Sequence, residues 1–229
     1  MKVILVRHGQ TELNAGGIYR GKLDVPQSAH GLVESEALGR ALSGTKLDRI
    51  VSSPLSRAVA TARVIASYHP NVDVEKAQEF VDMDFGEWQG LTIPEVKQHF
   101  PEAYQRWVRR PEIAEIPGGE KLRDVCARAL SGLKRIGSAH PEGTVVVVSH
   151  GVVNKVLLCI LLGATIAAFW NVKQDTGAIN IFEYSPLGTK VFLMNDLCHL
   201  ASVNDIISRM SKSDTPSGSS IGQERQRES

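Results

Sequence analysis

The sequence predicts an α/β fold, a three-layer sandwich in which a mostly parallel central sheet carries helices on both faces. Three observations predict it. Two short runs, residues 3–6 and 145–148, consist entirely of aliphatic side chains. Segments with the apolar spacing of helices alternate with such runs along the chain. Both runs lead, after one further residue, into a His-Gly pair, which places polar chemistry at the end of a buried strand.

Continuous aliphatic runs without polar alternation are typical of parallel strands that are buried on both faces. Residues 3–6 (VILV) and 145–148 (VVVV) fit this pattern. If these strands are neighbours in the sheet, the polar residues that follow them share one crevice. A shorter run at residues 49–51 (RIV) predicts a third strand that leads into a Ser-Ser-Pro sequence. Later in the chain, residues 179–184 and 190–194 flank a Ser-Pro-Leu-Gly sequence and predict a hairpin.

Five segments carry helical apolar spacing: residues 32–42, 54–68, 94–109, 120–139 and 152–162. The second of them follows a serine and has a proline in its first turn, which is a strong start signal. The longest apolar stretch, residues 156–170, is shorter than the roughly 20 residues of a membrane span. It therefore predicts a buried helix, and we expect no membrane partner.

Length and composition predict one domain with an extension. The chain has 229 residues, and we expect a single domain over residues 1–200 and a C-terminal extension over residues 201–229. From about residue 211 onward the extension has one aliphatic residue among Ser, Gly, Lys, Arg, Gln and Glu. Such a composition cannot bury enough apolar surface to fold, so we expect disorder from there.

The net charge and the cysteine content indicate which partners and which cellular location to expect. The 26 Lys and Arg residues and 25 Asp and Glu residues leave a net charge of +1. This balance produces no overall field that would attract nucleic acid, so we expect no nucleic-acid partner. The three cysteines lack CxxC spacing, which argues against a disulfide framework or a structural zinc site. A cytoplasmic, reducing location is the expectation.

Polar residues follow the predicted strands at the edge where open parallel sheets bind ligands, beyond the carboxyl ends. Arg7 and His8 follow the first strand, His150 follows the 145–148 run, and Arg57 lies in the first turn of the helix after the Ser-Ser-Pro sequence. Together these residues would form a site for a dianion such as phosphate, with forked donors from the arginines. No Asp, Glu and His trio has metal-ligand spacing, so we expect neither a metal nor a cofactor.

A nucleotide-binding P-loop is the alternative interpretation of residues 16–22 (GGIYRGK), which match its spacing as far as Lys22. The next residue is Leu23, which cannot hold magnesium as Ser or Thr would. Pro26 also prevents a helix from starting directly after the loop. We therefore reject the P-loop.

Five motifs occur in order: residues 5–14 (LVRHGQTELN), 52–58 (SSPLSRA), 84–90 (DFGEWQG), 117–120 (PGGE) and 148–151 (VSHG). Together they resemble the histidine phosphatase (phosphoglycerate mutase-like) superfamily, in its phosphatase branch, over nearly the whole chain before the extension. The resemblance implies a phosphoglycerate mutase-like fold and a metal-independent phosphomonoesterase.

The resemblance also implies a nucleophile, His8, that forms a phosphohistidine intermediate which water then hydrolyses. The attacking imidazole must be neutral, because an imidazolium has no lone pair. We expect Arg7 and Arg57 to keep it neutral by like-charge repulsion. With His150, these arginines would neutralise the phosphoryl oxygens in the transition state. Asn14 matches a family position that contacts the same oxygens.

The leaving alkoxide needs a proton from a carboxylic acid. Relatives usually have Glu two residues before the Asp-Phe-Gly of the third motif, and here Asp82 stands at that position. We expect Asp82 to be the general acid. Glu79, Asp84 and Glu87 are nearby alternatives, and we expect Glu79 and Glu87 to be solvated loop charges.

The substrate-binding residues that the resemblance implies are Asn14, Arg20, Gly21 and Gly151. Relatives commonly have Gln-Gly where this chain has Arg20 and Gly21. Arg20 either adds a cation at the pocket rim, which would favour a substrate with an extra anionic group, or is a surface residue. Three nearby aromatic residues either line the pocket or pack in the core: Trp88, Tyr104 and Trp107.

We therefore predict a histidine acid phosphatase-type phosphoric monoester hydrolase acting on a small phosphorylated metabolite. Two alternatives remain, a 2,3-bisphosphoglycerate-dependent phosphoglycerate mutase and a non-catalytic relative that binds phosphorylated ligands. Mutases of the family are typically longer, whereas the stretch over residues 80–117 is compact, which favours the phosphatase. Relatives are often dimers, so a homodimer is an expectation.

Overall fold

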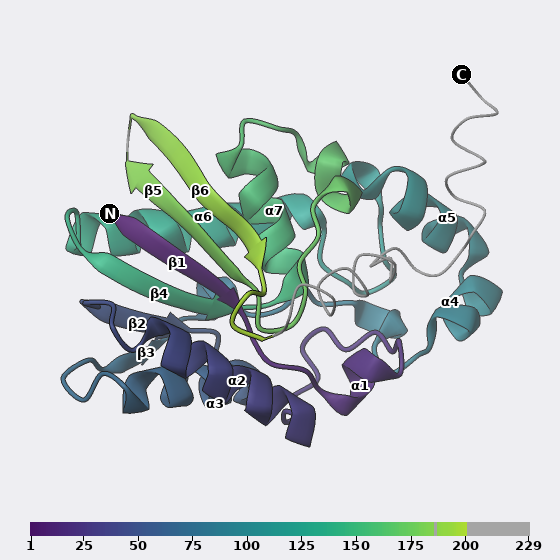
Figure 1. Cartoon of the computed structure of the whole chain (residues 1–229). Helices are drawn as coiled ribbons and strands as arrows, with labels where there is room; N and C mark the ends of the chain where they lie inside the picture. Colours follow the sequence, from purple (N-terminus) through teal and green to yellow (C-terminus); the bar gives the residue numbers. More distant parts are fainter. Residues whose placement is uncertain (186, 201–229) are drawn as a thin grey trace.

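The computed structural model describes residues 1–185 and 187–200. The predicted extension over residues 201–229, with its disorder from about residue 211, lies outside the described residues. The described part forms one six-stranded sheet in the order β3-β2-β4-β1-β5-β6 (Figure 1). Its strands are β1 (Lys2–Arg7), β2 (Arg49–Ser52), β3 (Val74–Lys76), β4 (Thr144–Ser149), β5 (Ile179–Ser185) and β6 (Gly188–Asp196).

The α-helices are α1 (Glu12–Ala15), α2 (Ala29–Leu42), α3 (Ser56–Ser67), α4 (Ile93–His99), α5 (Pro101–Arg109), α6 (Leu122–Ala139) and α7 (Gly151–Leu161). The described residues also include four short 3₁₀ turns: η1 (Gln78–Phe80), η2 (Gly86–Trp88), η3 (Pro111–Ile113) and η4 (Ile166–Asn171). Figure 1 shows α1, α4 and α5 grouped beyond the end of the sheet to which β1 points.

The sheet is mostly parallel, as predicted. β1 pairs with β4, β4 with β2, and β2 with β3, all in parallel. β5 is antiparallel to β1 and forms the predicted hairpin with β6. The sequence analysis missed β3, because its three residues lack the aliphatic run that identified the other parallel strands.

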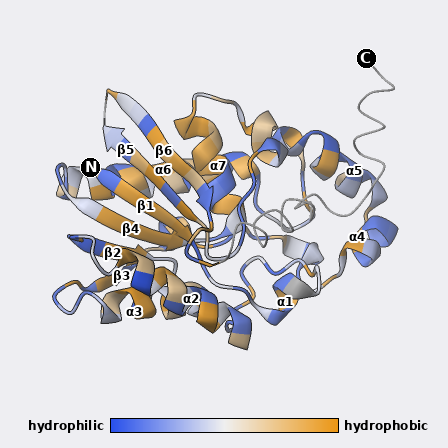
Figure 2. Ribbon diagram, in the orientation of Figure 1, coloured by the Kyte–Doolittle hydropathy of each residue, from blue (hydrophilic) through white to orange (hydrophobic). Residues whose placement is uncertain are grey.

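Alternate residues of the central strands enter two separate cores, which is why the aliphatic runs are continuous. Val3 and Leu5 of β1 pack in the larger core with α6 and α7, whereas Ile4 and Val6 pack in the smaller core with α2 and α3. Figure 2 shows β1 and β4 as largely apolar along their length. Burying one such side chain stabilises the folded state by about 1.5–3 kcal/mol. Because the side chains of each strand are buried in both cores, neighbouring strands are held in register and their ends are fixed. The predicted three-layer sandwich is confirmed.

The single helix predicted over residues 94–109 is wrong. The structure has two helices, α4 and α5, which meet at Phe100 with φ −132° and ψ 54°. The following residue is Pro101, whose ring disfavours helical geometry at the preceding position. The chain therefore turns at Phe100, and the two short helices form a cap over the larger core.

The N-terminus of α2 lies against the loop that follows β1. Ser28 caps this helix by accepting a hydrogen bond from the Gly31 backbone N–H at 3.1 Å. A Cβ atom on Gly31 would lie 2.1 Å from the Gln10 carbonyl oxygen, so only glycine permits this approach. The Gln10 N–H also donates to the buried Glu34 carboxylate at 2.7 Å. The loop after His8 is thus fixed by α2.

Among the helices of residues 1–185 and 187–200, none has the length and apolar character needed to cross a bilayer.

Candidate active site

The carboxyl ends of β2, β4 and β1 meet at one edge, which brings together the residues that the sequence places after each strand. In the sheet Ser52 pairs with Val148, which pairs with Val6. The His8 N–H donates to the Ser149 carbonyl oxygen at 3.1 Å, and the Ser53 N–H donates to the Val148 carbonyl oxygen at 2.9 Å. These backbone bonds position both segments immediately beyond the sheet.

His8 is fully buried, and its tautomer is fixed by the backbone. Its Nδ1 atom lies 2.6 Å from the Gly9 carbonyl oxygen. Because a carbonyl oxygen only accepts, Nδ1 carries the proton and Nε2 carries the lone pair. Within the part of the chain that the structure describes, Nε2 has no hydrogen-bond partner. Burial, then the neighbouring His150 and the charge of Arg57, hold the pKa of His8 well below its usual value, so the ring is neutral near pH 7.

His150 lies beside His8, with the ring centroids 5.0 Å apart. Its Nε2 atom is 2.7 Å from the Ser53 hydroxyl oxygen, and its Nδ1 atom is 3.6 Å from Asp82 Oδ2. Burial, followed by the charge of Arg57, holds the pKa of His150 well below its usual value. The sequence analysis placed the Ser-Ser-Pro sequence that contains Ser53 directly after a predicted strand, but it did not identify the contact with His150.

Arg57 is fully buried and has three partners. It donates to the carbonyl oxygens of Leu23 and Gly21 at 2.8 Å each, and its Nη2 lies 3.2 Å from Asp82 Oδ2. Gly21 has φ +52°, and a Cβ atom there would lie 2.4 Å from the Gln89 side-chain oxygen. Glycine at this position therefore lets its backbone approach closely enough to hold the guanidinium.

Arg7 and Arg20 add two more guanidinium groups. Arg7 donates to the Gln174 carbonyl oxygen and lies close to Gly151, where a Cβ atom would be 3.3 Å from Arg7 Cζ. Arg20 donates to the Thr11 hydroxyl oxygen at 3.1 Å. Burial, then the charge of Arg7, lowers the pKa of Arg20 to about 9, so it remains protonated at neutral pH. Arg20 is half-buried and lines the pocket, which favours the pocket position over the surface alternative.

Asp82 is the acidic side chain at the site. It is 3% exposed and lies between Arg57 and His150. The three alternative carboxylates point elsewhere: Glu79 pairs with Arg135 at 2.8 Å, Asp84 with Lys22 at 3.4 Å, and Glu87 is exposed.

Arg128 of α6 holds the segment that carries Asp82, and the sequence analysis did not identify it. Its guanidinium donates to the carbonyl oxygens of Glu79, Val81 and Asp82 at 2.8, 2.6 and 3.2 Å. The same group forms a two-point ion pair with Glu120 at 2.7 and 3.0 Å. One arginine thus fixes three carbonyl groups within four consecutive residues.

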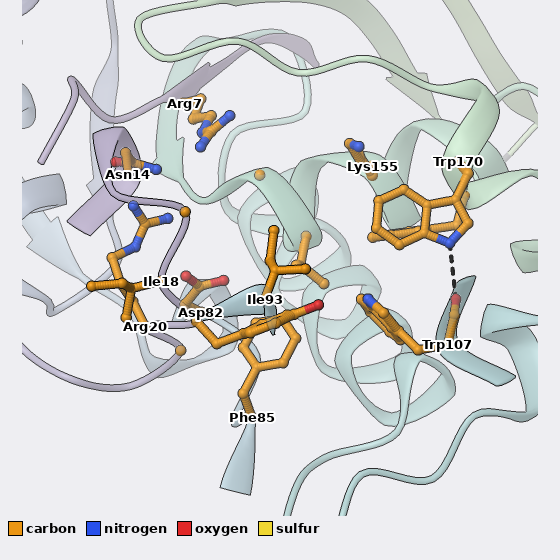
Figure 3. A pocket seen from close by; sticks show the side chains of 16 residues that line it. Arg7, Asn14, Ile18, Arg20, Asp82, Phe85, Ile93, Trp107, Lys155 and Trp170 are labelled. Atoms are coloured by element: carbon orange, nitrogen blue, oxygen red, sulfur yellow. Dashed lines mark hydrogen bonds between the residues drawn. The ribbon is translucent and has the colours of Figure 1, made fainter. Parts of the chain in front are cut away.

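Asn14 lies at the pocket with its amide oriented by α1. Its side-chain oxygen accepts from the Thr11 N–H and hydroxyl, both at 3.0 Å. The amide nitrogen is therefore the end of Asn14 that points toward the pocket (Figure 3).

These side chains border a cavity of about 380 Å³. It is lined by Arg7, Asn14, Gly17, Ile18, Tyr19, Arg20, Gly21, Asp82, Phe85, Ile93, Trp107, Gly151, Val152, Lys155, Phe169 and Trp170. Of the three aromatics considered above, Trp107 lines this cavity, whereas Trp88 and Tyr104 pack in the larger core. Within residues 1–185 and 187–200, no group of three or more His, Cys, Asp and Glu side chains is arranged to hold a metal ion.

Several known proteins are similar to this chain in sequence or in fold. Phosphoserine phosphatase 1 of Hydrogenobacter thermophilus is 36% identical over 200 residues, which cover 87% of this chain and 94% of that protein. Adenosylcobalamin/alpha-ribazole phosphatase of Escherichia coli is 29% identical over 177 residues, covering 77% of this chain and 87% of that protein. The solved structure of Bacillus stearothermophilus YhfR superposes with a TM-score of 0.84 at 26% identity, covering 87% of this chain and 99% of that one.

The YhfR superposition confirms the fold that the motifs implied. The phosphatase relatives support a phosphoric monoester hydrolase. The model of the histidine phosphatase superfamily (branch 1) matches residues 3–197, nearly all of the described chain. This chain belongs to branch 1 of the histidine phosphatase superfamily.

Proposed function

We propose that this protein hydrolyses small phosphomonoesters through a phosphohistidine intermediate on His8. One observation carries the proposal: His8 Nε2 is buried, bears the lone pair and has no partner among the described residues, beside three guanidinium groups. A buried nitrogen without a hydrogen-bond partner is costly in a merely structural role. A bound phosphoryl group would present its electrophilic phosphorus atom to this lone pair.

In the first step, His8 Nε2 attacks phosphorus in line with the ester oxygen. The N–P bond forms as the P–O bond to the alcohol breaks, and the protonated Asp82 carboxyl donates its proton to the leaving oxygen. In the second step a water molecule attacks phosphorus and gives a proton back to Asp82. The N–P bond breaks, and inorganic phosphate and neutral His8 are restored.

The cations supply the electrostatic part of the reaction. Arg7 and Arg57 each keep a buried Nε–H without a partner among the described residues, and Arg20 does the same. With His150 and the amide of Asn14, these donors hold the equatorial phosphoryl oxygens, on which negative charge is concentrated in the transition state. Gly21 and Gly151 contribute by allowing Arg57 and Arg7 to approach.

The test is phosphate release from a panel of phosphomonoesters in the presence of a chelator. We expect turnover by the wild type and a loss of at least about 10³-fold in His8→Ala, because removal of a covalent nucleophile eliminates the intermediate. His140→Ala is the matched control, since His140 lies at the opposite end of the sheet, just before β4. Appreciable turnover by His8→Ala would contradict the mechanism, and a requirement for added metal would contradict metal independence.

We also propose a cellular location for the enzyme. A reducing, cytoplasmic location fits three cysteines that are all free, two of them buried. We also propose that residues 1–200 form the catalytic domain and that the protein is a homodimer, which sedimentation of the full chain would test.

A further inference from the structure

Ser53 follows β2 directly, and its side chain is fully buried against His150. The Ser53 Oγ atom lies 2.7 Å from His150 Nε2. The Ser53 backbone is fixed on both sides. Its N–H donates to the Val148 carbonyl oxygen at 2.9 Å, and its carbonyl oxygen accepts from the Ser52 hydroxyl at 2.8 Å. The edge of the sheet therefore holds the Ser53 hydroxyl beside the imidazole.

The partners of this hydroxyl determine where its hydrogen points. A serine hydroxyl donates one hydrogen and accepts through two lone pairs. Among the described residues, Ser53 Oγ has two partners, the Leu55 N–H at 3.3 Å and His150 Nε2. A backbone N–H can only donate, so Oγ accepts from Leu55, as serine side chains do in local turns. The hydroxyl hydrogen is then directed to His150 Nε2, which accepts it.

The opposite arrangement would leave more buried groups without partners. If Nε2 carried the ring proton, it would donate to Ser53 Oγ, and the hydroxyl hydrogen would have no acceptor within residues 1–185 and 187–200. The lone pair would then lie on Nδ1, which is 3.6 Å from Asp82 Oδ2, too far for a hydrogen bond. Buried polar groups without partners cost free energy. The hydrogen bonds therefore favour the proton of the neutral ring on Nδ1, where a single hydrogen lacks a partner.

The Nδ1 atom of His150 lies on the side of the ring where the reaction takes place. It is buried and has no hydrogen-bond partner in the part of the chain that the structure describes, and Asp82 beside it lines the cavity. In a neutral imidazole, the hydrogen bond at one nitrogen decides what the other nitrogen presents. An N–H at Nδ1 can donate to a phosphoryl oxygen, whereas a lone pair at Nδ1 would repel it.

We propose that Ser53 is a positioning residue, whose hydroxyl donates to His150 Nε2 and thereby keeps a hydrogen on Nδ1 that binds the phosphoryl group. Ser53 acts through His150 and does not itself touch the substrate. The inference rests on the proposed function, because the phosphoryl group is the one that His8 receives.

The position of the ring proton can be read by NMR. In the full chain with 15N-labelled histidine, a multiple-bond correlation spectrum at neutral pH distinguishes protonated from unprotonated ring nitrogens, and the spectrum of His150→Asn assigns the His150 signals. We expect the proton on Nδ1 in the wild type. In Ser53→Ala we expect at least part of the population to carry it on Nε2. Ser53→Thr keeps the hydroxyl and should keep the proton on Nδ1.

Steady-state kinetics test the consequence for the reaction. Removing one donor to the developing charge costs about 10²–10³-fold in kcat. Because Ser53→Ala misdirects part of the population, we expect its kcat to fall by about 10-fold to 100-fold, with a smaller change in KM. The loss should be equal for alkyl phosphates and p-nitrophenyl phosphate, since both carry the same phosphoryl group.

Ser52→Ala is the matched control. Ser52 is as buried as Ser53, but its hydroxyl donates to the Ser53 carbonyl oxygen and does not contact His150. Its removal should therefore lower stability to a similar extent, while the His150 proton stays on Nδ1 and kcat stays within about threefold of the wild-type value.

A proton on Nε2 in the wild type would overturn the inference, even if Ser53→Ala did not fold. An unchanged tautomer or an unchanged kcat in folded Ser53→Ala would also overturn it. The spectrum needs no turnover, so the two proposals fail separately. Loss of turnover in His8→Ala together with a wild-type proton on Nε2 would support the proposed function and overturn the role of Ser53. A proton on Nδ1 in a wild type without turnover would contradict the proposed function and support the Ser53 hydrogen bond.

Discussion

Arg57 Nη2 and Asp82 Oδ2 lie 3.2 Å apart, and both side chains are buried. The same guanidinium also donates to the carbonyl oxygens of Gly21 and Leu23, so its position does not depend on Asp82 alone. Asp82 thus has a fixed cation on one side and the neutral His150 ring on the other. This arrangement makes the carboxyl group replaceable by an amide without collapse of the site.

We predict that Asp82→Asn slows the hydrolysis of alkyl phosphates far more than that of aryl phosphates. Alkyl phosphates, whose leaving groups need a proton, should lose about 10²–10⁴-fold in kcat, the range of general acid catalysis. p-Nitrophenyl phosphate, whose leaving group is stable as an anion, should lose less than about tenfold. Steady-state kinetics on both esters measure this, with Glu79→Gln as the control. Equal losses on both classes would exclude Asp82 as the acid.

Arg128→Met should damage both stability and catalysis. The substitution removes the donor to three carbonyl groups and leaves Glu120 without its partner, so we expect the free energy of unfolding to fall by about 2–3 kcal/mol in urea titrations. The kcat for alkyl phosphates should fall more than the kcat for p-nitrophenyl phosphate, since the Asp82 segment loses its support.

The matched control for that change is Arg135→Met. Arg135 pairs with Glu75 and Glu79 at 2.8 Å each, but it is about half exposed. Exposed ion pairs contribute little, so we expect a change below about 1 kcal/mol and an unaltered ratio of the two kcat values. If both variants behaved alike, Arg128 would have no special role in positioning Asp82.

The buried histidines predict a specific dependence of stability on pH. The pKa of His8 and that of His150 lie well below the ordinary value of about 6.5, so the folded protein binds fewer protons than the unfolded chain in acid. Stability contributed by the neutral rings is present above pH 6.5 and is lost as the pH falls toward the folded pKa values. Each ring lowers the free energy of unfolding by up to about 1.4 kcal/mol per pH unit below pH 6.5.

Urea unfolding between pH 7.5 and 5 measures this loss, and His8→Asn should show a shallower decline than the wild type. NMR titration gives a direct check, because the His8 and His150 ring resonances should not move between pH 8 and 6. An imidazole that titrates near 6.5 and disappears in His8→Asn would refute the prediction.

Gly31→Ala should lower the stability of the protein and slow catalysis. A methyl group would lie 2.1 Å from the Gln10 carbonyl oxygen, so either α2 or the loop after His8 must shift. We expect a loss of about 1–3 kcal/mol in the free energy of unfolding, as for other overpacked sites, together with a lower kcat. Gly44→Ala is the control, because nothing lies within 4 Å of its added methyl group. Similar behaviour of the two variants would show that the contact tolerates a side chain.

The structural features that could be predicted from the sequence are those determined by residues within a single segment of the chain. Aliphatic runs identified β1 and β4 because both faces of each strand are covered, and the polar residues directly after them placed His8 and His150 at one edge. The break at Phe100 was also encoded locally, by Pro101, and the helical spacing on either side obscured it.

Features that depend on distant segments could not be predicted in this way. Ser53 meets His150 across 97 positions, and Arg128 reaches the Asp82 segment from a helix more than 40 residues later in the chain. Lys155 lies within an apolar segment and faces Phe169 and Trp170, which the sequence does not relate to it. Which distant side chains come into contact depends on how the layers of the fold pack together. The spacing of residues along the sequence does not determine it.

The gathering of Arg7, Arg20 and Arg57 has a consequence for the unliganded protein. Burial and mutual repulsion lower the pKa of Arg20 and that of Arg57, so bringing these charges together opposes folding. Any tetrahedral oxyanion that enters relieves the repulsion and binds only the folded state. At 100 times its Kd such an anion stabilises the fold by about 2.7 kcal/mol. We therefore predict that inorganic phosphate raises the melting temperature of this protein as its concentration increases.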